Sequence, residues 1–173
     1  KLSIIIPCYN EGEVLPLTLE RFNALSHEWL AREDCTEVEF VLVDDGSQDK
    51  TQELLVEASK LEKHFKIIRF SRNFGHQAAL LAGYELAQGD VIVSLDADLQ
   101  NPPELISEML DKINEGNDVV SAVRKERNTD SWFKRFTAVG FYRLMKGLGA
   151  EIIHNHADFR MVTRRALNAF LQF

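Results

Sequence analysis

The sequence has few of the features that mark several large classes of protein. Among its 173 residues are only two cysteines, Cys8 and Cys35, with no C-x-x-C pair. That count argues against a disulfide framework or a cysteine zinc site and fits a reducing compartment. No apolar run reaches the roughly 18 residues that a membrane-spanning helix needs, and the N-terminus shows no signal-peptide pattern. An ordinary globular domain remains.

Basic residues are fewer than acidic ones, 20 against 27, and the formal net charge is −7. A protein that wraps nucleic acid needs a basic face, so no nucleic-acid partner is expected. The charge is uneven, because residues 124–146 hold seven basic and two acidic side chains. One basic patch on an acidic body predicts a specific anionic partner.

Strand and helix signals alternate along the chain. Short apolar runs predict buried strands at Leu2–Ile6, Val38–Val43, Ile67–Phe70, Val91–Leu95 and Val119–Val123. Apolar residues at helical spacing predict helices over residues 15–29, 54–61, 77–87 and 106–113 and from Arg164 to Phe173. The alternation predicts an α/β fold, with a mostly parallel sheet flanked by helices, as one domain over residues 1–173. Because the chain stops inside a helical pattern, we expect it to be the soluble part of a longer protein, with room for a membrane segment beyond it.

In such sheets ligands bind beyond the carboxyl ends of the strands. The segment Asp96-Ala97-Asp98 directly follows a predicted strand, and its carboxylates are hard oxygen ligands suited to Mg²⁺ or Mn²⁺. The oxygens of a diphosphate and of Gln100 would complete the metal shell. The alternative is that Asp98 caps a turn before Pro102.

Three other loops follow predicted strands. In Asp44–Ser47, one residue is expected to cap the following helix, while another accepts hydrogen bonds from a base or ribose. In Pro7–Gly12, Tyr9 offers a stacking face, and Cys8 is expected to be packed rather than nucleophilic. Arg124 has the side chain that binds phosphate oxygens in a fork.

Residues 133–148 predict a helix with one apolar face and a basic opposite face. A basic amphipathic helix can lie on an anionic membrane surface, and it can equally pack on the sheet. Both interpretations stay open at this point.

Four strings resemble family 2 glycosyltransferases: Pro7–Glu11 (PCYNE), Asp44–Ser47 (DDGS), Ser71–Gly75 (SRNFG) and Leu95–Glu104 (LDADLQNPPE). The likeness is greatest to the polyprenyl-phosphate glycosyltransferases, which are related to dolichyl-phosphate mannose synthase. Ala157–Arg160 resembles the part of that branch that transfers glucose-type sugars to bacterial lipid carriers, such as bactoprenol. The resemblance implies a GT-A (Rossmann-like) fold and a metal-dependent, inverting transfer from a nucleotide sugar.

The resemblance also implies residue roles. Asp98 and Gln100 would hold Mg²⁺ or Mn²⁺ with the donor diphosphate. Asp158 stands where processive relatives place an acidic base, and here it would take a proton or only orient the acceptor. The implied catalytic residues are Asp96, Asp98, Asp158 and Arg124. The residues implied to bind the nucleotide sugar are Pro7, Tyr9, Glu11, Val43, Asp45, Asp96, Ala97, Asp98, Arg124 and Arg135.

These implications predict transfer of a sugar, from a UDP-hexose by preference or from GDP-mannose, to undecaprenyl or dolichyl phosphate. The expected place is the cytoplasmic face of the cell membrane, where the basic patch would meet the lipid phosphate. The alternative is a family 2 enzyme that acts on a saccharide or other hydroxyl acceptor in cell-wall or surface polysaccharide synthesis. A phospho-receiver domain also carries paired aspartates after a strand, but it leaves Asp96–Glu104 unexplained. A homo-oligomer is compatible with every one of these interpretations.

Overall fold

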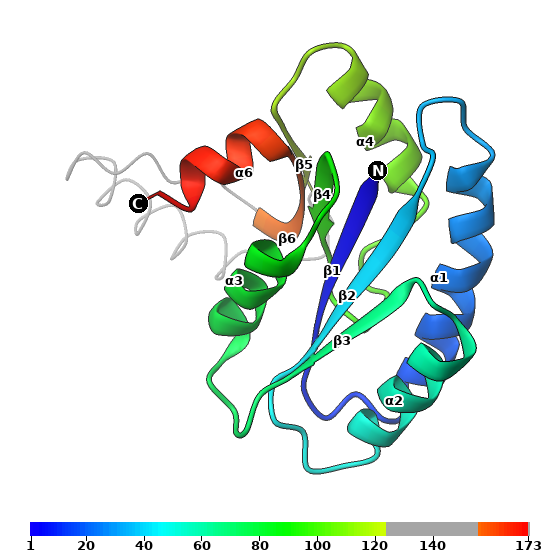
Figure 1. Ribbon diagram of the computed structural model, residues 1–173, viewed down its shortest axis with the longest axis vertical. Coiled ribbons are helices and arrows are strands. Elements are labelled where there is room, and N and C mark those ends of the chain that lie inside the picture. The colour runs from blue at the N-terminus through cyan, green and yellow to red at the C-terminus, as the bar shows by residue number, and fades with distance from the viewer. Residues whose placement is uncertain (124–155, 173) are drawn as a thin grey trace, which may run out of the picture. The chain divides into compact units, whose positions relative to one another are not determined.

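The structure of the chain is a computed structural model that describes residues 1–123 and 156–172 (Figure 1). Its strands are β1 (Leu2–Cys8), β2 (Val38–Asp44), β3 (Phe65–Arg69), β4 (Val91–Ser94), β5 (Val119–Val123) and β6 (His156–Thr163). Its helices are α1 (Leu15–Leu30), α2 (Thr51–Leu61), α3 (His76–Leu86), α4 (Leu105–Asn114) and α6 (Arg164–Phe170).

The described sheet has six strands in the order β3-β2-β1-β4-β6-β5. Strands β3, β2, β1 and β4 run parallel to one another, whereas β6 is antiparallel to β4. The predicted α/β fold with a mostly parallel sheet is therefore confirmed, and each of the five expected strands is present. The sixth, β6, was not expected. Its buried Phe159 and Met161 alternate with Arg160 and Val162, which is a weak period-two signal.

The first strand is longer than predicted, because it continues through Pro7 to Cys8. The sequence suggested that Pro7 would end the strand, since proline cannot donate a ladder hydrogen bond. The carbonyl of Ile5 accepts a bond from Leu95 after β4, and that of Cys8 accepts one from Asp45 after β2. Because successive residues of a strand bond to opposite sides, the nitrogen of Pro7 faces the β4 side. The β1–β4 ladder ends at the Ile5↔Ser94 pair, and no ladder bond is lost at the proline.

Helices cover both faces of the sheet, with α1 and α2 on one side and α3 on the other (Figure 1). On the α1 side, Phe22 stacks on Phe40 of β2 with ring centroids 5.6 Å apart, and Trp29 lies beside the same ring. On the α3 side, Ala79 and Leu80 belong to a buried apolar cluster with strand residues such as Ile5. Residues that alternate along each strand thus bury themselves on both faces, as a parallel sheet requires.

Most of the described elements belong to one compact unit, Lys1–Ser121 with Asp158–Phe173, and Ala122–Ala157 form a second. A single domain over residues 1–173 stays a prediction. Among residues 1–123 and 156–172, no helix combines the length and the apolar character needed to cross a bilayer. The basic amphipathic helix expected over residues 133–148 lies outside the described residues.

Candidate active site

The loops that follow β1, β2, β3 and β4 meet at one edge of the sheet and line a hollow of about 270 Å³. Such a position at the carboxyl ends of parallel strands is the one that the topology predicts for a ligand. Seven of the predicted site residues line the hollow, together with four that were not assigned to it. The lining residues are Pro7, Cys8, Tyr9, Glu11, Asp45, Asn73, His76, Ala79, Asp96, Ala97 and Asp98.

Five predicted residues are not among those that line the hollow. Val43 is fully buried within β2. Gln100 is exposed, and its backbone N–H donates to Oδ1 of Asp98 over 2.9 Å. Asp158 lies in β6. Arg124 and Arg135 fall outside the described residues.

The loop after β1 is tied to the loop after β2 by reciprocal hydrogen bonds. The backbone N–H of Asn10 donates to Oγ of Ser47 over 3.0 Å, and the N–H of Gln48 donates to Oδ1 of Asn10 over 2.9 Å. The N–H of Glu11 donates to Oγ1 of Thr51 over 2.8 Å. Because backbone groups at both loops are paired, the loops hold each other and present Glu11 to the hollow.

Asp45 is buried, at 2% exposure, and its carboxylate holds the loop after β3. One oxygen accepts the backbone N–H of Phe74 over 2.7 Å, and the other accepts that of Gly75 over 2.9 Å. Bonds from an amide to a charged acceptor are stronger than neutral ones. Asp45 therefore sets the loop that brings Asn73 and His76 to the hollow, whatever else its oxygens bind.

The predicted helix cap among Asp44–Ser47 is wrong. The N-cap of α2 is Lys50, which makes no side-chain cap bond. Oδ1 of Asp49 accepts the N–H of Thr51 over 2.9 Å instead. Asp44 stabilises the turn that it begins, because its Oδ1 accepts the N–H of Ser47 over 2.9 Å.

Three carboxyl side chains, those of Glu11, Asp96 and Asp98, line the hollow with Asp45. Burial, followed by the charges of Asp98, Asp49 and Asp96, raises the pKa of Glu11 above its ordinary value. Among the described residues that line the hollow, none is a lysine or an arginine. The described lining therefore has more acidic than basic side chains, with His76 as its single basic residue.

Sequence reasoning assigned no role to His76 or Asn73, although the Ser71–Gly75 string that precedes His76 was singled out. His76 is the first residue of α3, and its Nε2 lies 4.0 Å from Oδ1 of Asp96. The signal that could have identified both residues is their position after β3, because the other strands of the parallel set also end at this edge.

The side chains of the hollow could supply only some of the ligands that a hard cation needs. Asp98 is exposed and offers carboxylate oxygen, as Mg²⁺ and Mn²⁺ prefer. Within residues 1–123 and 156–172, however, no three His, Cys, Asp or Glu side chains are grouped so that they could hold a metal ion. A cation beside Asp98 would therefore take further oxygens from a bound molecule. Cys8 is buried, which raises the pKa of its thiol and confirms the expectation of a packed residue.

Comparisons with known proteins agree on one family. The family model described as Glycosyl transferase family 2 matches residues 3–171. A relative named uncharacterized glycosyltransferase YkcC, from Bacillus subtilis (strain 168), is 45% identical over 164 residues, which cover 94% of this chain and 49% of the relative. The chain spans about half the length of the curated relatives it matches.

Solved structures show the same fold. The mannosyltransferase PcManGT from Pyrobaculum calidifontis, in complex with GDP-Man and Mn²⁺, matches with a TM-score of 0.67 at 20% identity, over 98% of this chain and 46% of that one. S. aureus TarS 1-349 in complex with UDP matches with a TM-score of 0.56 at 26% identity, over 76% of this chain and 37% of that one. The fold of the described chain is therefore the GT-A fold.

Proposed function

This chain belongs to glycosyl transferase family 2, and we propose that its protein transfers a sugar from a nucleotide sugar to a polyprenyl phosphate. The donor half of this proposal depends on the hollow at the carboxyl ends of β1 to β4. The acceptor half depends on the resemblance to the polyprenyl-phosphate branch and on the basic segment 124–146.

The observation that carries the donor half is the acidic lining of the hollow, which has four carboxyl side chains and no lysine or arginine among its described residues. A nucleoside diphosphate is itself an anion, so the carboxylates of Glu11 and Asp98 would oppose its approach. Asp98 would hold a divalent cation that offsets this repulsion, and the phosphate oxygens would complete its ligands. The Mn²⁺ and GDP-Man in PcManGT and the UDP in TarS support this class of ligand.

Different lining residues would contact different parts of the nucleotide-sugar donor. Tyr9, 43% exposed, offers a ring face to the nucleoside beside Pro7. Asp45 holds the loop around the base and ribose, and Asp96 with Ala97 faces the ribose or the sugar. Asp98 would hold the Mg²⁺ or Mn²⁺, with Gln100 as a further oxygen ligand. The cation would supply charge stabilisation for the departing diphosphate.

The acceptor oxygen needs little activation in this proposal. A lipid phosphate is already anionic near neutral pH, so Asp158 would orient the acceptor or the sugar hydroxyls rather than take a proton. Arg124 and Arg135 would bind phosphates of the donor or the acceptor, since a guanidinium pairs with phosphate in a fork. The same basic segment would draw the protein to an anionic membrane surface.

The test supplies the purified protein with polyprenyl phosphate in membranes, Mg²⁺ or Mn²⁺, and labelled UDP- and GDP-sugars in turn. We expect label in the lipid extract for one donor, and release of the sugar by mild acid, because a glycosyl phosphate is acid-labile. An acid-resistant product would instead assign a hydroxyl acceptor. Absence of labelled lipid with every donor would contradict the proposal.

The variant Asp98→Asn checks the donor half. Because Asp98 is exposed, we expect the fold to survive, while transfer falls about 100-fold or more through lost stabilisation of the leaving group. Glu57→Gln, at an exposed position on α2, is the control that removes one acidic charge elsewhere. Equal transfer by Asp98→Asn and the wild type would remove Asp98 from the metal site.

A further inference from the structure

We infer that Thr18, on α1, is a positioning residue that sets the acidic loop Asp96–Asp98 for metal-dependent donor binding. The inference rests on the proposed function, because the metal and the nucleotide that the loop would bind are part of that proposal. Thr18 does not line the hollow. It acts through the backbone of Ala97.

The observation is a buried hydrogen bond between α1 and the loop. Thr18 has 0% exposure, and its Oγ1 donates to the carbonyl oxygen of Ala97 over 2.7 Å. A threonine inside a helix commonly donates to the carbonyl four residues earlier. Here that carbonyl, of Val14, lies 3.1 Å from Oγ1. A hydroxyl has one proton, and the shorter contact is the one to Ala97.

The bonded carbonyl stands between the two carboxylates of the loop. Fixing the carbonyl of Ala97 fixes the peptide plane that joins Ala97 to Asp98, and with it the position of the Cα atom that carries the Asp98 side chain. Ala97 is itself 2% exposed. The loop has no regular secondary structure there, and Leu99 has a φ of 57°. The N–H of Gln100 bonds to Oδ1 of Asp98 within the loop, and the bond from Thr18 adds a contact from outside it.

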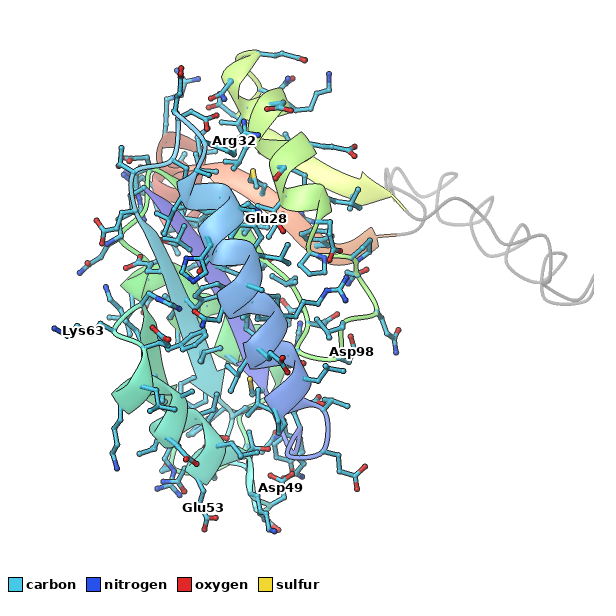
Figure 2. All side chains as sticks on the ribbon, turned by 90° about the vertical axis from the view of Figure 1, so that its right-hand side faces the viewer. Glu28, Arg32, Asp49, Glu53, Lys63 and Asp98 are labelled. Carbon is cyan, nitrogen blue, oxygen red and sulfur yellow. The ribbon has the colours of Figure 1, made fainter. Side chains whose placement is uncertain are left out.

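The same face of α1 makes a second contact with this connection. Arg21, three residues after Thr18 and so on the same side of the helix, pairs with Glu104, its Nε lying 2.8 Å from Oε1. Thr18 and Arg21 thus hold α1 against both ends of the segment 97–104, and Figure 2 shows Asp98 on this loop beside α1. The Arg21–Glu104 pair is exposed and contributes little by itself, whereas the bond from the hydroxyl of Thr18 is buried.

Three substitutions at Thr18 separate the hydroxyl from the methyl group. Thr18→Val keeps the shape and removes the donor, Thr18→Ser keeps the donor and removes the methyl, and Thr18→Ala removes both. Ser26→Ala is the matched control, because Ser26 is also buried on α1 but donates to the carbonyl of Asn23 within the same helix.

The measured quantity is the metal dependence of nucleotide binding in the whole protein. Calorimetry gives the Kd of UDP, and in parallel of GDP, with Mn²⁺ and with EDTA. The ratio of the two Kd values is the gain due to the metal. Residues that orient metal ligands typically change metal affinity by about 10–100-fold. We expect Thr18→Val and Thr18→Ala to reduce the ratio by at least about 10-fold, and Thr18→Ser and Ser26→Ala to leave it within about twofold of the wild type.

A merely structural role would lower the melting temperature and leave the ratio unchanged, which would overturn the inference. An equal loss of the ratio in Thr18→Ser and Thr18→Ala would also overturn it, since the methyl group would then be responsible. If Thr18→Val does not fold, the comparison of Thr18→Ser with Thr18→Ala decides the question.

The same measurement separates this inference from the proposed function. A wild type without any metal-dependent gain for either nucleotide would contradict both. A wild type with that gain but no labelled lipid product would contradict the polyprenyl-phosphate acceptor alone, and the Thr18 comparison would stand.

Discussion

At the scale of single residues, Glu11 is a carboxyl group of the hollow whose charged form the fold disfavours. Its carboxyl group is partly buried and faces the charges of Asp98 and Asp96. A residue held in that way is destabilising in the free protein, and charge of this kind is found at functional sites.

The pH dependence of Glu11 gives a residue-scale prediction. Because the fold raises the pKa of Glu11 above its ordinary 4.5, the folded state binds the proton more tightly than the unfolded chain. The stability that this provides is present below pH 4.5 and is lost as the pH rises through the folded pKa. We expect Glu11→Gln to raise the Tm at pH 7 slightly, by about 1–2 °C, and to weaken nucleotide binding with Mn²⁺.

The difference between Glu11→Gln and the wild type should vanish below pH 4.5, where both side chains are neutral. The control Glu57→Gln should show no such pH-dependent difference, because Glu57 lies on the exposed side of α2. Thermal unfolding followed from pH 4 to pH 8 provides the measurement. A Tm gain that persists unchanged at pH 4 would show that the carboxylate charges are not its cause.

At the scale of elements, the site depends on how closely the loops after β2 and β3 approach each other. Gly46 has a φ of 70°, and a Cβ built on it would lie 2.4 Å from the backbone carbon of Arg72. Together with the bonds from Asp45 to Phe74 and Gly75, this contact joins the two loops into one wall of the hollow.

Replacement of Gly46 by alanine tests that wall. Gly116 is the matched control, because it has a φ of 100° but open space around its Cβ position. We expect Gly116→Ala to lower the free energy of unfolding by about 1–2 kcal/mol through left-handed strain alone. Gly46→Ala should lower it further, because backbone must move, and only Gly46→Ala should weaken nucleotide binding. Chemical denaturation and calorimetry measure both effects, and equal losses would refute the loop contact.

At the scale of the whole molecule, an acidic hollow on a chain of net charge −7 predicts that the proposed donor binds better with added divalent cations. A ligand that binds only the folded state raises stability by mass action. At 100 times its Kd the gain is about 2.7 kcal/mol, and about 2–4 °C of Tm accompanies each kcal/mol in a domain of this size.

We therefore expect UDP or GDP with Mn²⁺ to raise the Tm by about 5–10 °C at such concentrations. EDTA should abolish the shift, because without the cation the carboxylates of Glu11 and Asp98 oppose the diphosphate. A thermal-shift panel of purine and pyrimidine nucleotide sugars would also identify the base. An equal shift in the presence of EDTA would contradict metal-mediated binding.

Much of this protein follows from the sequence by itself. Apolar runs that alternate with helical spacing predict a parallel sheet, and parallel strands place all their carboxyl ends at one edge. For that reason Tyr9, Asp45 and Asp98, far apart along the chain, were expected near one another and do line one hollow. The order of residues also showed that Asp45 and Asp98 place carboxylate oxygens beside strand ends.

Tertiary contacts decided the rest. Strand β6 lies between β4 and β5, although it comes after both in the chain, and local periodicity carries no information about such an insertion. The carboxylate of Asp45 is engaged by backbone amides of another loop, and the hydroxyl of Thr18 reaches the carbonyl of Ala97. Sequence patterns report which residues share a face or a strand end, because those depend on neighbours along the chain. Partners of individual polar groups depend on how separate elements pack, and only the folded structure determines them.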